Sequence, residues 1–236
     1  MEPFSVSLLF TTGSVALMHA LVGPDHWLPF VMLSRARRWT LWRTLLVTLV
    51  CGLGHVLSSV GLGLLATALG WQATRLAGVE GARGLLAAWL LLAFGVAYAA
   101  WGVRRGARRR RGLELHAHDG SVHLHAQGER PHAHEGAPDD DDSQGVAFWT
   151  LFVVFVLGPC EPMIPLLVAP ASRGQWSLTL WVAAVFSAMT IVAMLAIVAI
   201  VRLGLVHLRF ARLARWSHAL AGGAIALCGL AVILGA

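Results

Sequence analysis

The chain has 236 residues, of which 57% are hydrophobic and only 13% charged, and its mean hydropathy is +0.70. A soluble domain carries about 25% charged residues, so this composition excludes a soluble globular fold. All 18 basic residues are arginines, and they cluster between apolar runs, a pattern that indicates membrane topology rather than a nucleic-acid-binding face. The composition predicts an all-α polytopic membrane protein that has the lipid bilayer, and no nucleic acid, as its partner.

Six apolar stretches are long enough to cross a bilayer, which takes about 20 residues of helix. They are residues 5–33, 41–69, 84–103, 146–169, 177–201 and 214–235. The first stretch does not have the form of a cleavable signal peptide, because it lacks a basic start and is too long. We therefore expect six transmembrane helices.

The arginines also predict the orientation of these helices. Fifteen of the 18 lie in the connections after the first, third and fifth stretches, and only Arg75, Arg83 and Arg173 lie on the other side. Cytoplasmic loops carry the excess of Lys and Arg in membrane proteins. We therefore expect a bacterial inner-membrane protein with both termini outside.

The first and fourth stretches share a proline-broken motif. Gly23-Pro-Asp-His-Trp-Leu-Pro29 corresponds to Gly158-Pro-Cys-Glu-Pro-Met-Ile-Pro165. Inverted repeats with broken helices that meet near the midplane are a common transporter plan. The sequence predicts two inverted three-helix repeats, residues 1–103 and 146–236, with helices one and four broken. The polar segment 104–145 between them is expected to be cytoplasmic and disordered.

Ligand-type side chains accompany the first break. His19 and His26 are seven residues apart, about two helical turns, and Pro24 frees backbone groups beside Asp25. Imidazole with carboxylate suits borderline metals such as nickel, cobalt and zinc. The alternative is a kinked helix in which His19 bonds a neighbouring carbonyl.

The second and fourth stretches add further candidates. His55 lies on one stripe with Gly52 and Ser59, which predicts a third imidazole aimed at the first helix or, alternatively, a plain packing stripe. Cys160 and Glu161 occupy the second break, where Glu161 needs a cation, a proton or a partner. Cys160 is either a soft ligand or a small packing residue.

The segment between the repeats contains three His-x-His pairs. Such pairs on a polar chain chelate divalent metals weakly and exchange them fast. This auxiliary metal-binding loop consists of His116, His118, His123, His125, His132 and His134.

The motif around Asp25 and His26, followed by Leu53-Gly-His55, resembles the nickel/cobalt transporter family of the lysine-exporter-like superfamily. This resemblance implies that His19, Asp25, His26 and His55 recognise metal, and that the His-rich loop traps or senses it. The Gly158-Pro-Cys-Glu-Pro162 element is more similar to urease-accessory-like and sulfite-exporter-like membrane proteins, and to thiol–disulfide electron carriers of cytochrome c maturation.

These features predict a transporter of divalent transition metals, nickel or cobalt first and zinc as a further candidate, and not an enzyme. The metal would be the transported substrate, and no tightly bound cofactor is expected. Two alternatives are an accessory membrane protein that delivers metal to a nickel enzyme and a transmembrane thiol–disulfide relay. The direction of transport and a homo-oligomeric assembly are left open.

Overall fold

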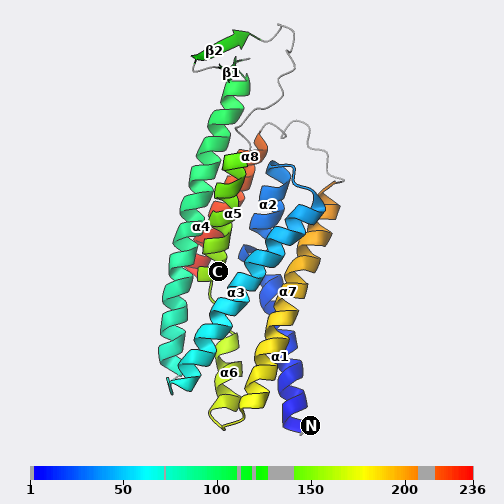
Figure 1. Cartoon of the computed structure of the whole chain (residues 1–236), viewed down its shortest axis with the longest axis vertical. Helices are drawn as coiled ribbons and strands as arrows, with labels where there is room; N and C mark the ends of the chain where they lie inside the picture. Colours follow the sequence, from blue (N-terminus) through cyan, green and yellow to red (C-terminus); the bar gives the residue numbers. More distant parts are fainter. Residues whose placement is uncertain are drawn as a thin grey trace.

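The computed structural model describes residues 3–71, 73–110, 113–118, 121–126, 141–206 and 216–235, and shows an elongated helical bundle (Figure 1). Within these residues, five helical segments are long and apolar enough to cross a membrane. They are Phe4–Val22, Leu41–Ala68, Ala73–Ala107, Trp176–Gly204 and Ser217–Leu234. The chain is therefore a multi-pass helical membrane protein.

The first apolar stretch is broken as predicted. Helix α1 (Pro3–Val22) ends one residue before Gly23, a 3-10 turn η1 (Pro24–His26) follows, and α2 (Leu28–Ala36) continues the path. Pro24 lacks the N–H that would continue the helix, so the break follows from its chemistry. The turn places polar side chains in the interior of the bundle.

The fourth stretch, 146–169, is also broken, as the sequence predicts, but its two pieces are shorter than a spanning helix. It consists of α5 (Asp141–Leu157) and α6 (Met163–Ala171), and neither helix meets the length of a spanning helix. Pro159 and Pro162 cannot donate backbone hydrogen bonds, so no continuous helix passes through these residues.

The remaining helices are continuous. They are α3 (Leu41–Ala68), α4 (Ala73–Arg110), α7 (Trp176–Val206) and α8 (Ser217–Leu234). Thr40 caps the start of helix α3, and its hydroxyl oxygen accepts a hydrogen bond of 3.2 Å from the Arg43 N–H. Helix α4 is longer than the predicted stretch 84–103, so Arg75 and Arg83, assigned above to a loop, belong to it.

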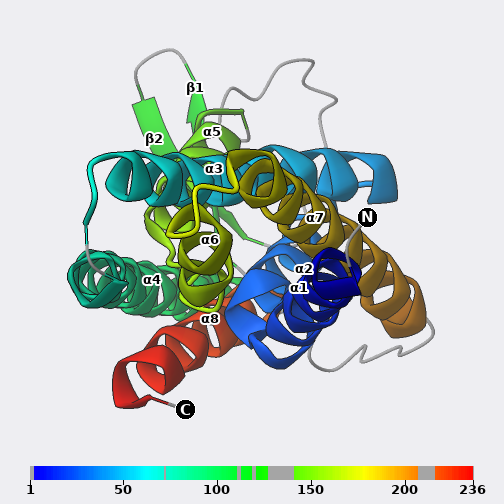
Figure 2. The ribbon, with the colours of Figure 1, turned by 90° about the horizontal axis from the view of Figure 1, so that it is seen from below.

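The broken segments lie between two pairs of long helices. Helix α3 packs against α7, and α4 packs against α8. Seen from below, α1–α2 and α6 lie between these pairs (Figure 2). Both breaks are thereby held inside the bundle, where protein can satisfy irregular backbone.

Small residues allow α4 and α8 to approach closely. A Cβ atom added at Gly95 would lie 2.3 Å from the Ala226 backbone nitrogen, and one added at Gly222 would lie 2.2 Å from the Ala99 backbone nitrogen. Close contact between helices through small residues is a typical source of stability in membranes. Lipid tails are as apolar as the helix side chains, so the hydrophobic effect does not drive helices together there.

Gly95→Ala is therefore expected to destabilise the bundle by about 1–3 kcal/mol, the usual cost of overpacking. Gly78→Ala on the same helix is the matched control, because a Cβ there meets nothing within 4 Å. Thermal unfolding in detergent micelles measures the difference. Equal melting temperatures for the two variants would contradict the close α4–α8 contact.

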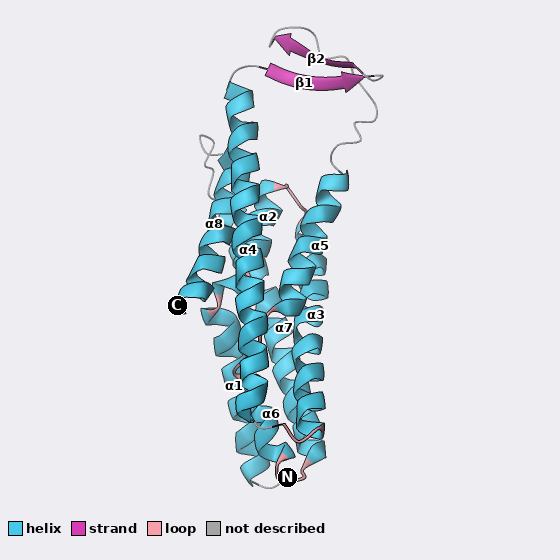
Figure 3. Ribbon diagram, turned by 90° about the vertical axis from the view of Figure 1, so that its left-hand side faces the viewer, coloured by secondary structure: helices cyan, strands magenta, loops and turns pink. Residues whose placement is uncertain are grey.

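The segment 104–145, expected to be disordered, contains regular structure. Its start belongs to α4, its end belongs to α5, and strands β1 (Leu113–His118) and β2 (Ser121–Ala126) pair antiparallel between them (Figure 3). Both strands alternate polar and apolar residues, the period expected of a strand. The expectation of disorder for residues 127–140 falls outside the described part of the chain and stays a prediction.

Candidate metal centre

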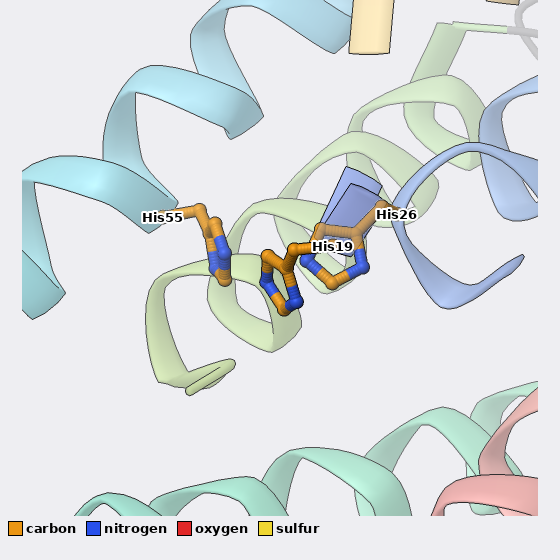
Figure 4. Close-up of side chains that lie close together, drawn as sticks. All are labelled: His19, His26 and His55. Atoms are coloured by element: carbon orange, nitrogen blue, oxygen red, sulfur yellow. The ribbon is translucent and has the colours of Figure 1, made fainter. Parts of the chain in front are cut away.

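Three imidazoles from separate turns of the fold meet in the bundle (Figure 4). His19, His26 and His55 each offer a ligand atom, and these atoms all lie within 4.8 Å of one another. The ring centroids of His19 and His26 are 4.5 Å apart, and those of His26 and His55 are 5.1 Å apart. The three predicted imidazoles thus form one group, called the histidine trio below.

The first break brings two members of the trio together. His19 lies in the last turn of α1, and its carbonyl accepts the Gly23 N–H at 3.1 Å. His26 ends the 3-10 turn, and its ring meets that of His19 edge to face, at an interplanar angle of 75°. Gly23 makes this possible, because a Cβ there would lie 2.7 Å from His26 Nδ1 and 2.9 Å from Asp25 Oδ1.

The residues at the second break hold the third imidazole, that of His55, in its orientation. His55 is 2% exposed on α3, and its Nδ1 lies 3.0 Å from the Phe155 carbonyl oxygen. Since a carbonyl only accepts, Nδ1 carries the proton, which leaves Nε2 as the free lone pair. Nε2 lies 2.9 Å from the Cys160 Sγ. A second-shell carbonyl of this kind typically orients a metal-binding imidazole.

Several nitrogens of the trio lack a hydrogen-bond partner in the protein. Within the described part of the chain, His19 Nε2 and both ring nitrogens of His26 are buried and have no hydrogen bond. Buried polar atoms are nearly always hydrogen-bonded, and each exception costs about 1–3 kcal/mol. Asp25 Oδ1 lies 3.2 Å from His26 Nδ1, which adds a negative charge beside these nitrogens. The trio is therefore a candidate metal-binding group.

The space beside the trio is small. A cavity of about 40 Å³ is lined by Asp25, His26 and His55 on one side and by α4 and α5 on the other. This is room for roughly three water molecules, enough for a partly hydrated ion. His19 instead lines a separate, more open hollow of about 400 Å³ beside Met18 and Pro162.

The second break contributes one of its two predicted ligands. Cys160 is 1% exposed and contacts His55, whereas the Glu161 side chain is exposed and lies beside Gly81 of α4. The Met163 and Ile164 N–H groups bond the carbonyls of residues 160 and 161, a turn that directs adjacent side chains to different sides. The structure therefore does not bring Glu161 to the trio.

The loop histidines are only partly described. The hairpin register pairs the backbone of His116 with that of His123, and Glu114 with His125. His132 and His134 lie outside the described residues. The auxiliary loop stays a prediction.

Sequence reasoning missed a buried ion pair near the centre. Glu80 is 2% exposed and forms a salt bridge with Arg83, both from α4. The arginine pattern predicts an outer connection for Arg83 and does not single out Glu80. Their i, i+3 spacing, which suits an ion pair on one helix face, was the available signal.

Comparisons of the chain with protein-family models, with curated proteins and with solved structures give no match. The family resemblance of the Asp25-His26 and Gly54-His55 motifs therefore stays a prediction. The function has to be argued from the geometry of the site.

Proposed function

We propose that this protein transports divalent transition-metal cations, nickel or cobalt first and zinc as a further candidate, across the bacterial inner membrane. The observation that carries the proposal is the convergence of buried imidazole nitrogens without hydrogen-bond partners beside a carboxylate. Imidazole is a ligand for borderline metals and a poor one for magnesium or calcium. The ion itself is the substrate.

The spacing of the trio suits binding that can be reversed. Metal–imidazole distances of about 2.0–2.1 Å place tetrahedral nitrogens about 3.4 Å apart. The ligand atoms here lie within 4.8 Å of one another, so the rings must close by roughly an ångström around an ion. A transport site has to bind strongly enough to load and weakly enough to release.

The charges of the site favour a divalent ion paired with a thiolate. The three neutral imidazoles bring no charge, and Asp25 brings one negative charge. A deprotonated Cys160 would bring the second and make the loaded site neutral, which lowers the cost of holding an ion inside the membrane.

The helix packing supports the proposed inverted repeat and its motion. Helix α1 packs on α7 just as α5 packs on α3, and α3–α7 and α4–α8 pair the corresponding helices of the two halves. Rocking of one half against the other would expose the trio alternately to the hollow at His19 and to the cavity at His55. In this scheme both termini are outside, and the His-rich hairpin gathers metal in the cytoplasm.

The two alternatives differ in what supports them. All three cysteines are free and belong to three different core clusters, which gives no support to a thiol–disulfide relay. A metal-delivery protein would use the same trio without moving ions across the membrane. Only a flux measurement separates it from a transporter.

The test is metal flux into proteoliposomes that contain a metal-sensitive dye, across nickel, cobalt, zinc and magnesium. We expect flux of the first three and none of magnesium, above the leak of protein-free vesicles. Binding of metal without flux would support delivery instead. Flux that His26→Ala leaves unchanged would contradict the site.

Gly23→Ala is expected to weaken metal binding roughly 10–100-fold, the range seen when the support of a ligand is disturbed. The added methyl would lie 2.7 Å from His26 Nδ1 and displace the ring. Gly61→Ala is the matched control, since a Cβ there meets nothing within 4 Å. Cobalt titration in detergent measures both variants, and equal affinities would argue against His26 as a ligand.

A further inference from the structure

One buried network ties three helices to the second break. Arg83 Nη2 donates to the Val156 carbonyl oxygen at 2.7 Å and to the Ser58 hydroxyl at 3.0 Å. The Ser58 hydroxyl itself donates to the same Val156 carbonyl at 2.7 Å. The network therefore joins α3 and α4 to the end of α5.

The carboxylate of Glu80 divides its two oxygens between two partners. Oε1 binds the Arg83 guanidinium, and Oε2 accepts the Cys160 backbone N–H at 3.3 Å. The proline-rich break leaves that N–H without a helical partner, and Glu80 supplies one. Because Glu80 and Arg83 neutralise each other, the pair adds no charge to the metal centre.

The network is linked to the metal centre at two points, the Phe155 carbonyl and the Cys160 thiol. Val156 follows Phe155, whose carbonyl orients the His55 ring, and the anchored amide belongs to Cys160, whose sulfur lies 2.9 Å from His55 Nε2. The ion pair thus fixes both the imidazole and the thiol from outside the ligand set. No other described acidic side chain bonds to this break.

We propose that Glu80 and Arg83 are positioning residues that hold the Cys160 thiol where it becomes the fourth metal ligand. This inference rests on the proposed function. On loading, the S–H bond breaks, an S–metal bond forms, and one proton is released to the medium. The thiolate selects softer cations such as cobalt, nickel and zinc over magnesium.

Glu80→Gln tests the inference, because an amide has one acceptor oxygen and cannot serve both Arg83 and the Cys160 N–H. The protein is the full chain in detergent with the six loop histidines replaced by asparagine, and Co²⁺ is the probe. The readouts are the near-ultraviolet thiolate-to-cobalt absorption band and the proton released per ion bound.

In the unaltered site we expect the band and about one proton per Co²⁺, the stoichiometry of a thiol that binds as thiolate. Glu80→Gln is expected to lose the band and weaken binding roughly 10–100-fold, and Glu80→Asp, which keeps both oxygens, to restore part of the band. Glu161→Gln is the matched control, with the same change beside Cys160, and should keep the full band.

Each result decides between the proposals. A full band in Glu80→Gln would overturn the positioning role, and Co²⁺ binding without any band in the unaltered site would overturn Cys160 as a ligand while leaving the trio intact. Absence of Co²⁺ binding altogether would overturn the proposed function. If Glu80→Gln does not fold, Arg83→Lys replaces it, since Lys has one nitrogen where Arg83 uses Nη1 for Glu80 and Nη2 for Ser58 and Val156. An unchanged band there would equally overturn the inference.

Discussion

His26→Ala is expected to lower the affinity for Ni²⁺ and Co²⁺ by on the order of 100-fold or more, because disturbing an outer-shell partner alone costs 10–100-fold. His26 is the central ring of the trio, with His19 at 4.5 Å and His55 at 5.1 Å. Its loss leaves two imidazoles of the three that form the group. Titration of Co²⁺ in detergent, followed by its visible absorption, measures the change.

The matched control is His218→Ala. His218 also lies in a membrane helix, but its Nδ1 is 2.7 Å from the Tyr98 hydroxyl and it is no part of the trio. Its removal is expected to leave metal affinity unchanged. Equal loss in both variants would mean that the effect comes from altered folding, and full affinity in His26→Ala would remove the trio as the site.

Arg83→Ala is expected to lower the free energy of unfolding by about 3–5 kcal/mol, the usual cost of leaving one member of a buried ion pair alone. The substitution strips Glu80, which is 2% exposed, of its counter-charge and removes the donor to the Val156 carbonyl. Reversible denaturation in mixed micelles is the measurement.

Arg75→Ala provides the comparison on the same helix. The Arg75 guanidinium lies over the Trp71 ring at 5.1 Å on an exposed position, so its loss should change stability little. A similar small effect for Arg83→Ala would show that the buried network does not stabilise the bundle.

The trio could be predicted from the sequence because local chemistry fixes it. Pro24 enforces a break between His19 and His26, and the Gly52–His55–Ser59 stripe predicts which face of α3 approaches it. These short-range rules predict the break between His19 and His26 and the face of α3 that carries His55, and the fold brings the three imidazoles together. The membrane character follows from composition alone.

Other features depend on contacts between distant segments. Glu161 and Cys160 are adjacent, and only the fold decides that the thiol faces His55 while the carboxylate faces outward. The sequence does not single out Glu80, which the fold places beside Arg83 and the Cys160 amide. Pro159 and Pro162 predict the break in the fourth stretch from the sequence. They do not predict how short α5 and α6 are.

The most direct test of the central claim is nickel X-ray absorption on the full chain with its six loop histidines replaced by asparagine. Imidazole nitrogens at about 2.0–2.1 Å, joined by one sulfur at about 2.3 Å, are the expected shell. A shell made only of oxygens, in which the ion keeps its water ligands, would contradict a site built from His19, His26 and His55.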